Sequence, residues 1–222
     1  MTSWAIVPVK SLRRGKSRLT TALTPAEREE FNRNMLLHTL EVLGRVRRLE
    51  RTLVISRDPA ALSIAHEHGA YTVAESGRPE LNVALRQATD VAHAFGAQAV
   101  LVLPTDLPLI TGADVRAMLE AGIGPEPNVV VAPDRHSEGT NALLIRPPGL
   151  LQYQFGARSL QAHVAQAQRL AVPLQLCLRP GLQLDIDVPD DLTLLRRLNN
   201  RAPAAGGGRW SPVGDGAGQI GV

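Results

Sequence analysis

Three separate segments of the sequence carry charged side chains that could bind a polyphosphate and a metal ion. The first is a loop with five cations and no acidic residue: Lys10, Arg13, Arg14, Lys16 and Arg18. It follows Ala5–Val9, an apolar run rich in β-branched residues that predicts a buried strand. Ligands of open α/β sheets bind outside the carboxyl ends of the strands. The loop therefore predicts a polyphosphate site, with a solvated basic turn as the alternative.

The second and third segments supply carboxylates. Asp106 closely follows the apolar run Ala99–Leu103, which is typical of a strand buried on both faces. Asp185 and Asp187 alternate along an extended segment, so their side chains share a face and repel unless a cation or water separates them. Because Mg²⁺ takes one or two carboxylates together with substrate phosphates, the three aspartates predict a magnesium site. The alternatives are a turn cap at Asp106 and a solvated pair with Asp187 at a helix start.

Two further motifs predict a second binding site. Gly139-Thr140 precedes an apolar strand-like run, and Phe155-Gly156 precedes a helical pattern that begins near Ser159. Backbone N–H groups and hydroxyls at a helix N-terminus are what a small phosphorylated acid requires. Either motif alone would be weak evidence for that ligand.

Several other classes of function are excluded. Gly15-Lys16-Ser17 resembles the end of a phosphate-binding P-loop, but Lys10 stands where that motif requires glycine, and no G-x-G-x-x-G follows any strand. The sequence also lacks the H-E-x-x-H pattern of zinc sites and the G-x-S-x-G pattern of serine hydrolases. A net charge of +3 and an aromatic content of 3% argue against a nucleic-acid partner.

The single cysteine, Cys177, excludes an internal disulfide and is expected to be an unreactive residue of the core. With neither a signal peptide nor an apolar run of membrane-spanning length, we expect a cytoplasmic protein without a membrane partner.

Strand and helix patterns alternate along the chain and predict a βαβ series with a largely parallel sheet. After the first strand, further strands are predicted over Thr52–Ser56, Tyr71–Ala74, Ala99–Leu103, Val129–Ala132, Asn141–Ile145 and Leu174–Leu178. Helices are predicted from the capping box at Thr24 to about Arg48, from Pro59 to about His68, over Glu80–Phe95, after Thr111, over Arg158–Arg169 and over Pro189–Leu198. The domain thus occupies residues 1–200, and the Gly-, Ala- and Pro-rich residues 201–222 are expected to be a disordered tail.

Taken together, these segments resemble one family. Val-Pro-Val-Lys with Gly-Lys-Ser-Arg-Leu, Asp-Leu-Pro-Leu-Ile, Gly-Thr-Asn-Ala-Leu, Phe-Gly-x-x-Ser and Asp-Ile-Asp-x-Pro-x-Asp-Leu occur in the order typical of the guanylyltransferases of coenzyme F(420) biosynthesis. The resemblance covers about residues 4–198. It implies an α/β three-layer sandwich with a mostly parallel central sheet, of the nucleotide-diphospho-sugar-transferase type. The implied reaction transfers GMP from GTP to a phosphorylated three-carbon acid and releases diphosphate.

The resemblance also implies roles for individual residues. Lys10, Lys16 and Arg18 would hold the triphosphate, and Asn82 would face the nucleotide. Asp106 would bind Mg²⁺ with Asp185 or Asp187 as its partner, so Lys16 and Asp106 are the expected catalytic residues. Thr140, Gly156 and Ser159 match positions that bind the phosphoacid. One departure is Gly15, where the family more often has alanine, and this glycine is expected to loosen the basic loop.

Some questions stay open on the sequence. Phosphoenolpyruvate, 2-phospho-L-lactate and 3-phosphoglycerate are all candidate acceptors, with phosphoenolpyruvate favoured by analogy with bacterial members. The sequence does not fix guanine over other bases, and it leaves a homodimer open. The alternative enzyme is a molybdenum cofactor or sugar-phosphate nucleotidyltransferase, whose larger acceptor should need a longer lobe than residues 140–180. The alternative outside enzymes is a nucleotide-binding regulatory module, which would not need three aspartates placed for a metal.

Overall fold

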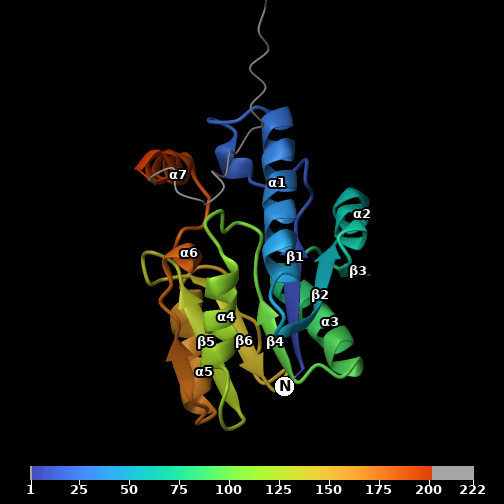
Figure 1. Ribbon diagram of the computed structural model, residues 1–222, viewed down its shortest axis with the longest axis vertical. Coiled ribbons are helices and arrows are strands. Elements are labelled where there is room, and N and C mark those ends of the chain that lie inside the picture. Colours follow the sequence, from blue (N-terminus) through green and yellow to red (C-terminus); the bar gives the residue numbers. More distant parts are fainter. Residues whose placement is uncertain (1, 202–222) are drawn as a thin grey trace, which may run out of the picture.

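A seven-stranded sheet with strand order β3-β2-β1-β4-β6-β5-β7 forms the centre of the computed structural model, which describes residues 2–201 (Figure 1). β1, β2, β3 and β4 are mutually parallel, and β7 is parallel to β5. β6 alone runs antiparallel to its neighbours β4 and β5. The prediction of a mostly parallel sheet is confirmed. The strands are β1 (Ser3–Val9), β2 (Leu49–Ser56), β3 (Tyr71–Ala74), β4 (Ala99–Val102), β5 (Asn128–Pro133), β6 (Thr140–Arg146) and β7 (Leu174–Leu176).

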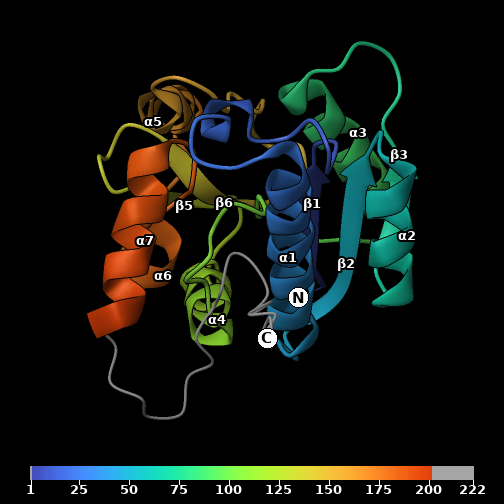
Figure 2. The same cartoon turned by 90° about the horizontal axis from the view of Figure 1, so that it is seen from above.

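Helices cover both faces of the sheet, which gives the predicted three layers (Figure 2). The helices are α1 (Pro25–Gly44), α2 (Pro59–Glu67), α3 (Leu81–Ala94), α4 (Gly112–Ala121), α5 (Ser159–Arg169), α6 (Pro180–Gln183) and α7 (Pro189–Arg201), with a short 3₁₀ turn η1 (Ser17–Leu19). Within residues 2–201, none of these helices is both long and apolar enough to cross a membrane.

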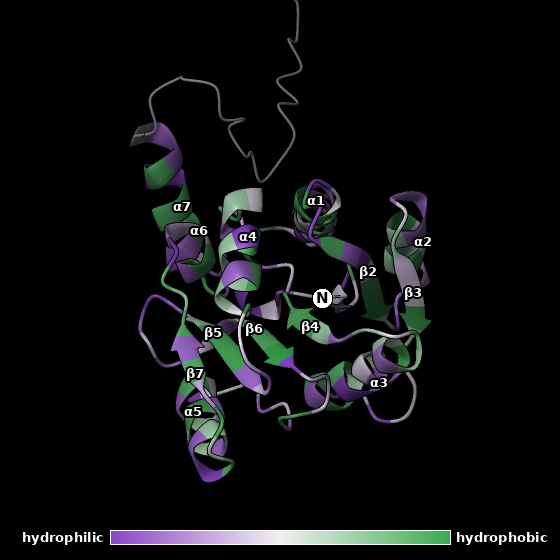
Figure 3. Cartoon of the chain, turned by 60° about the horizontal axis from the view of Figure 1, so that its bottom comes forward, coloured by the Kyte–Doolittle hydropathy of each residue, from purple (hydrophilic) through white to green (hydrophobic). Residues whose placement is uncertain are grey.

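The apolar core is divided by the sheet. On one face, side chains of β1, β2 and β4 pack with α1, α2, α4 and α6, and on the other face the alternate side chains pack with α3 and α5. Figure 3 shows this as hydrophobic strands enclosed by helices whose hydrophilic sides face outward. A third cluster joins α7 and η1 to the first turns of α1 through residues such as Leu19, Phe31 and Ile186. Because each fully buried Leu or Ile side chain contributes roughly 1.5–3 kcal/mol, this cluster anchors the site-bearing segments firmly.

Side-chain caps set the starts of α1, α2 and α4, as the sequence predicts. Thr24 and Thr111 both form capping boxes, with Glu27 and Asp114 respectively. The predicted end of α1 was wrong, because the helix stops at Gly44 and Val46 turns inward to the core. β7 is also shorter than predicted, and α6 was not anticipated. Arg179, at the start of α6, forms an ion pair with Asp114 on α4 (Nε–Oδ1, 2.9 Å). The predicted tail, residues 201–222, lies outside the described residues apart from Arg201 at the end of α7.

Gly181 allows α6 to approach α4 closely. A Cβ atom at this position would lie 2.3 Å from the Asp114 carboxylate and 2.7 Å from the Leu109 carbonyl oxygen. Asp114 is itself buried and holds both the Thr111 cap and Arg179. Glycine is therefore required where α6 leads the chain into the Asp185–Asp187 segment.

We predict that Gly181→Ala destabilises the fold by about 1–3 kcal/mol, because the added methyl group must displace a buried carboxylate or a backbone carbonyl. Gly44→Ala is the matched control, since nothing lies within 4 Å of a Cβ atom at that helical position. Gly44→Ala should leave stability unchanged or raise it slightly. Chemical denaturation of both variants provides the measurement, and equal free energies of unfolding would contradict the prediction.

Candidate active site

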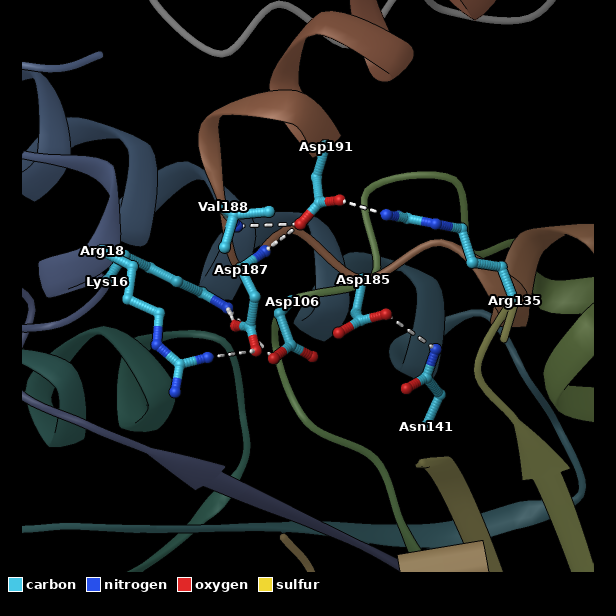
Figure 4. A network of polar contacts seen from close by, with 9 residues as sticks. All are labelled: Lys16, Arg18, Asp106, Arg135, Asn141, Asp185, Asp187, Val188 and Asp191. Carbon is cyan, nitrogen blue, oxygen red and sulfur yellow. Dashed lines mark hydrogen bonds and ion pairs between the residues drawn. The ribbon is translucent and has the colours of Figure 1, made fainter. Parts of the chain in front are cut away.

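Lys16 lies at the centre of the candidate site. It follows β1 in a left-handed backbone conformation (φ 52°, ψ 44°), and its side chain is only 16% exposed. Its Nζ atom lies 3.1 Å from Asp106 Oδ2 and 2.9 Å from Asp187 Oδ1. Asp106 follows β4, which is paired directly with β1. The structure therefore brings together the cation and two of the carboxylates that the sequence singled out (Figure 4).

The loop that carries Lys16 is fixed by backbone contacts on both sides. Gly15 N donates to Ser11 O (2.7 Å), Asn32 Nδ2 donates to Leu12 O (2.7 Å), and Leu12 N donates to Asp58 Oδ2 (2.8 Å). A Cβ atom on Gly15 would come within 2.9 Å of both Asn32 Nδ2 and Ser11 O. Close packing against Asn32 and Ser11 therefore explains the glycine at position 15, rather than the expected loosening of the loop.

Asp106 and the Asp185–Asp187 segment are joined through their backbones. Ile186 N donates to Asp106 O at 3.0 Å, which fixes the two segments side by side. Asn141 Nδ2 donates to Leu182 O (2.9 Å) and lies 3.4 Å from Asp185 Oδ1. Asp185 and Asp187 face the same side, as the alternation predicts, and both lie near Asp106 (Figure 4).

The charges of these groups perturb one another. Burial lowers the pKa of Lys16, but the negative charges of Asp106 and Asp187 outweigh it and raise that pKa above its usual value. Burial raises the pKa of Asp187, but Lys16, Arg18 and Lys10 together hold it below the usual range. The pKa of Asp185 is raised by burial and by the charges of Asp106 and Asp187. Lys16 thus stays cationic and stabilises the ionised form of Asp187.

The other basic residues of the loop lie further out. Arg18 NH1 is 4.0 Å from Asp187 Oδ2, and its side chain is 74% exposed. Lys10 is exposed, and Arg13 pairs with Glu29 on α1 at 3.2 Å. Arg14 is exposed as well. Exposed cations before and after the ion-paired Lys16 in the sequence give the loop an excess of positive charge next to the aspartates.

Sequence reasoning missed Asp191 and Arg135. Asp191, in the first turn of α7, accepts hydrogen bonds from the backbone N–H groups of Asp187 (2.7 Å) and Val188 (2.8 Å). Arg135 NH2, from the loop between β5 and β6, lies 2.7 Å from Asp191 Oδ1. The sequence did contain a signal for Asp191. It follows Pro189 by two positions in the first turn of a predicted helix, where acidic side chains commonly cap the backbone.

The residues predicted to bind the phosphoacid lie together in the structure. Thr140 N donates to Ser159 Oγ (2.8 Å), and both residues are buried. Thr140 Oγ1 lies 3.1 Å from His163 Nδ1, while Gln154 N donates to His163 Nε2 (3.2 Å). Gly156 is exposed, with φ 137°, next to the start of α5. The structure brings these residues together in one cluster of loops. The hydroxyl groups of Thr140 and Ser159 also form hydrogen bonds that hold these loops in place.

Asn82 connects the predicted nucleotide side to this cluster. It lies in the first turn of α3, where its Oδ1 accepts from Phe155 N (2.8 Å) and its Nδ2 donates to Phe155 O (3.2 Å). Both ends of the amide are therefore paired with the backbone of one residue. In this arrangement Asn82 fixes the loop before Gly156, rather than presenting a free amide.

Comparison with known proteins places the chain in a family. The family model for "Guanylyl transferase CofC like" matches residues 3–197. The chain belongs to the CofC-like guanylyl transferase family. A phosphoenolpyruvate guanylyltransferase of Rubrobacter xylanophilus is 42% identical over 212 residues, which are 96% of this chain and 98% of that protein. A 2-phospho-L-lactate guanylyltransferase of Methanothermobacter thermautotrophicus is 35% identical over 86% of this chain and 83% of its own length.

Solved structures support the predicted fold of this family member. A protein from Desulfovibrio desulfuricans described as a nucleotide-diphospho-sugar transferase superposes with a TM-score of 0.75 at 18% identity, covering 91% of this chain and 90% of its own. CMP:2-keto-3-deoxy-manno-octonic acid synthetase superposes with a TM-score of 0.62 at 14% identity, covering 89% of this chain and 98% of its own. These likenesses confirm the nucleotide-diphospho-sugar-transferase type of sheet.

The buried His163 generates a prediction about pH. Burial lowers its pKa from 6.5 to about 4, and Nε2 must stay unprotonated to accept from Gln154 N. Between pH 6.5 and about pH 4, this histidine is protonated in the unfolded chain but not in the folded protein. Stability should therefore fall as the pH decreases from 6.5 towards 4, by up to roughly 3 kcal/mol.

Denaturation at several pH values can separate this contribution from those of other groups. His163→Gln should be less stable at pH 7 and should lose part of the slope between pH 6.5 and 4. His136→Gln, which changes an exposed histidine, is the control and should keep the slope of the wild type. An unchanged slope in a folded His163→Gln protein would refute the assignment.

Proposed function

We propose that this chain transfers GMP from GTP to phosphoenolpyruvate and releases diphosphate, as a step in coenzyme F(420) biosynthesis. The observation that carries the proposal is the position of Lys16 between Asp106 and Asp187 at the carboxyl edge of the sheet. Family members named phosphoenolpyruvate guanylyltransferase, from Rubrobacter xylanophilus and Sphaerobacter thermophilus among others, support the choice of acceptor. Since GTP and phosphoenolpyruvate are cytoplasmic metabolites, the proposal places the reaction in the cytoplasm.

In the proposed reaction the acceptor phosphate is itself the nucleophile. One of its oxygens forms a bond to the α-phosphorus of GTP, and the bond from that phosphorus to the bridging oxygen of the leaving diphosphate breaks. No proton has to be removed from the nucleophile, so the protein needs no general base. Its task is to bring two strongly anionic molecules into line and to offset their charge.

The basic loop supplies that charge compensation. The Lys16 side chain is only 16% exposed and is held in its cationic form, so it suits the triphosphate and the charge that develops on the leaving diphosphate. Lys10 and Arg18 are exposed at the same edge and can meet the outer phosphates. A low-dielectric position strengthens the interaction of Lys16 with phosphate relative to that of the exposed cations.

The aspartates fit a magnesium ion by the chemistry of their donors. Among residues 2–201, no three His, Cys, Asp or Glu side chains are grouped closely enough to hold a metal ion by themselves. Magnesium in nucleotide sites needs only one or two carboxylates, because substrate phosphates complete its shell. Asp106, with Asp187 or Asp185, would hold the ion, and bound Mg²⁺ would neutralise charge at the α-phosphate.

The acceptor would bind at the cluster of Thr140, Gly156 and Ser159. The Ser159 oxygen accepts from Thr140 N, which leaves its hydroxyl hydrogen free to donate to an anion. Gly156 exposes backbone close to the first turn of α5, where the helix dipole favours a negative charge. Asn82 would act on the nucleotide side by fixing the Phe155 backbone that precedes this cluster.

A second acceptor has support of its own. The relative from Methanothermobacter thermautotrophicus is named 2-phospho-L-lactate guanylyltransferase.

Purified protein should be incubated with GTP, Mg²⁺ and, in turn, phosphoenolpyruvate, 2-phospho-L-lactate and 3-phosphoglycerate, while diphosphate release is followed and the product mass is measured. We expect the highest kcat/KM with phosphoenolpyruvate, and ATP and CTP in place of GTP test the choice of base. Absence of diphosphate with every acid would refute the proposed function.

We predict that Asp106→Asn lowers turnover by at least about 100-fold while the protein stays folded, because a neutral amide is a poor ligand for Mg²⁺. Asp190→Asn is the matched control, since Asp190 is exposed in the first turn of α7. Its activity should match that of the wild type. Activities should be measured over a range of Mg²⁺ concentrations, and near-normal turnover of Asp106→Asn at low Mg²⁺ would contradict the assignment.

A further inference from the structure

The backbone that carries Asp187 is held by a carboxylate that itself takes no part in the proposed site. The Oδ2 atom of Asp191 accepts from both Asp187 N (2.7 Å) and Val188 N (2.8 Å), and the Asp191 side chain is only 3% exposed. Two charge-assisted hydrogen bonds to one oxygen fix the direction of the Asp187 peptide. The orientation of the Asp187 side chain therefore depends on where Asp191 sits.

Arg135 supplies the counter-charge for Asp191. Its NH2 group lies 2.7 Å from Asp191 Oδ1, as a close charge pair rather than an aligned hydrogen bond (Figure 4). The side chain of Arg135 is 30% exposed, so one side of the pair reaches solvent. Removing the partner of a buried carboxylate is costly, because the buried charge is left uncompensated. Without Arg135, the Asp191 carboxylate would keep its two backbone hydrogen bonds but lose the ion pair at its Oδ1 atom.

The loop that carries Arg135 also reaches the acceptor cluster. Arg135 N donates to Gln183 O (3.0 Å), which attaches the loop to the end of α6. Asp134 Oδ1 accepts from His136 N and Glu138 N and so closes the turn. Glu138 O in turn accepts from Leu160 N in the first turn of α5, beside Ser159. One short loop thus contacts both the aspartate segment and the helix start proposed to meet the phosphoacid.

We infer that Arg135 is a positioning residue: through Asp191 it orients Asp187 and so determines how tightly the metal–nucleotide complex is held. The inference rests on the proposed function. Arg135 touches neither substrate nor metal in this scheme, and its effect passes through the Asp187 backbone. Residues that orient metal ligands typically change metal affinity or activity by about 10–100-fold when they are replaced.

The test compares Arg135→Met, Arg135→Lys and Arg146→Met. Arg146 is the matched control, because it also forms a partly buried ion pair (with Glu126, 3.2 Å) but lies at the other end of β6. For each variant, kcat, the KM for GTP and the half-saturating Mg²⁺ concentration are measured, together with the melting temperature. Electron paramagnetic resonance of Mn²⁺ in the presence of GTP reports metal affinity without turnover.

We expect Arg135→Met to weaken Mn²⁺ binding and lower kcat by about tenfold or more, and to raise the half-saturating Mg²⁺ concentration correspondingly. Arg135→Lys should recover most of the loss, since it keeps the charge. Arg146→Met should alter these parameters less than about twofold, even if its melting temperature falls equally. Unchanged Mn²⁺ affinity in Arg135→Met, or equal losses in Arg146→Met, would overturn the inference.

The two failures are distinguishable. If the wild type releases no diphosphate with any acid, the proposed function fails, while the Mn²⁺ measurements still decide the role of Arg135. If the wild type binds no Mn²⁺ in the presence of GTP, the inference is overturned, because there is then no metal–nucleotide complex for Asp187 to hold.

Discussion

The ion pairs of Lys16 with Asp106 and Asp187 are the interaction on which the rest of the site depends. Three carboxylates gathered at one edge of a sheet repel one another, and partial burial strengthens that repulsion. The Lys16 ammonium, 3.1 Å and 2.9 Å from two of them, offsets it. Because its partners are 90 and 171 residues away in the sequence, the same contacts also join the loop after β1 to the segment that leads into α7.

The topology of the sheet explains how these residues meet. β1 lies between β2 and β4 and is parallel to both, so the loop after β1 and Asp106 after β4 leave the sheet at the same edge. β6 is antiparallel to β4 and β5, so β5 also ends at that edge, and the loop containing Arg135 begins there. Because β6 alone is reversed, the loop that carries Arg135 lies at the same edge of the sheet as the basic loop.

Polar side chains in this region hold the loops that surround the candidate site. Asn82 pairs with the N–H and the carbonyl of Phe155, and Ser159 accepts from Thr140 N. Asn141 donates to the backbone at the end of α6. Buried polar groups need hydrogen-bond partners, so residues near such a site acquire structural contacts even where they also bind ligand. This gives the candidate site a rigid frame, in which the positions of Asp187 and Ser159 are coupled through one short loop.

The sequence by itself determined the order of the elements, the capped starts of α1 and α4, the strands of the sheet and the family to which the chain belongs. It also identified Lys16 and Asp106, because charged residues that follow buried parallel strands lie at the sheet edge where ligands bind, and Asp187, because alternation places it beside Asp185. Only the tertiary structure decided that Lys16 pairs with two of these aspartates, that Asp191 and Arg135 support Asp187, and that Asn82 binds the Phe155 backbone. Those contacts join residues far apart in the chain. They depend on strand order, on the reversal of β6 and on the close approach of α6 at Gly181, and local patterns carry no information about such long-range packing.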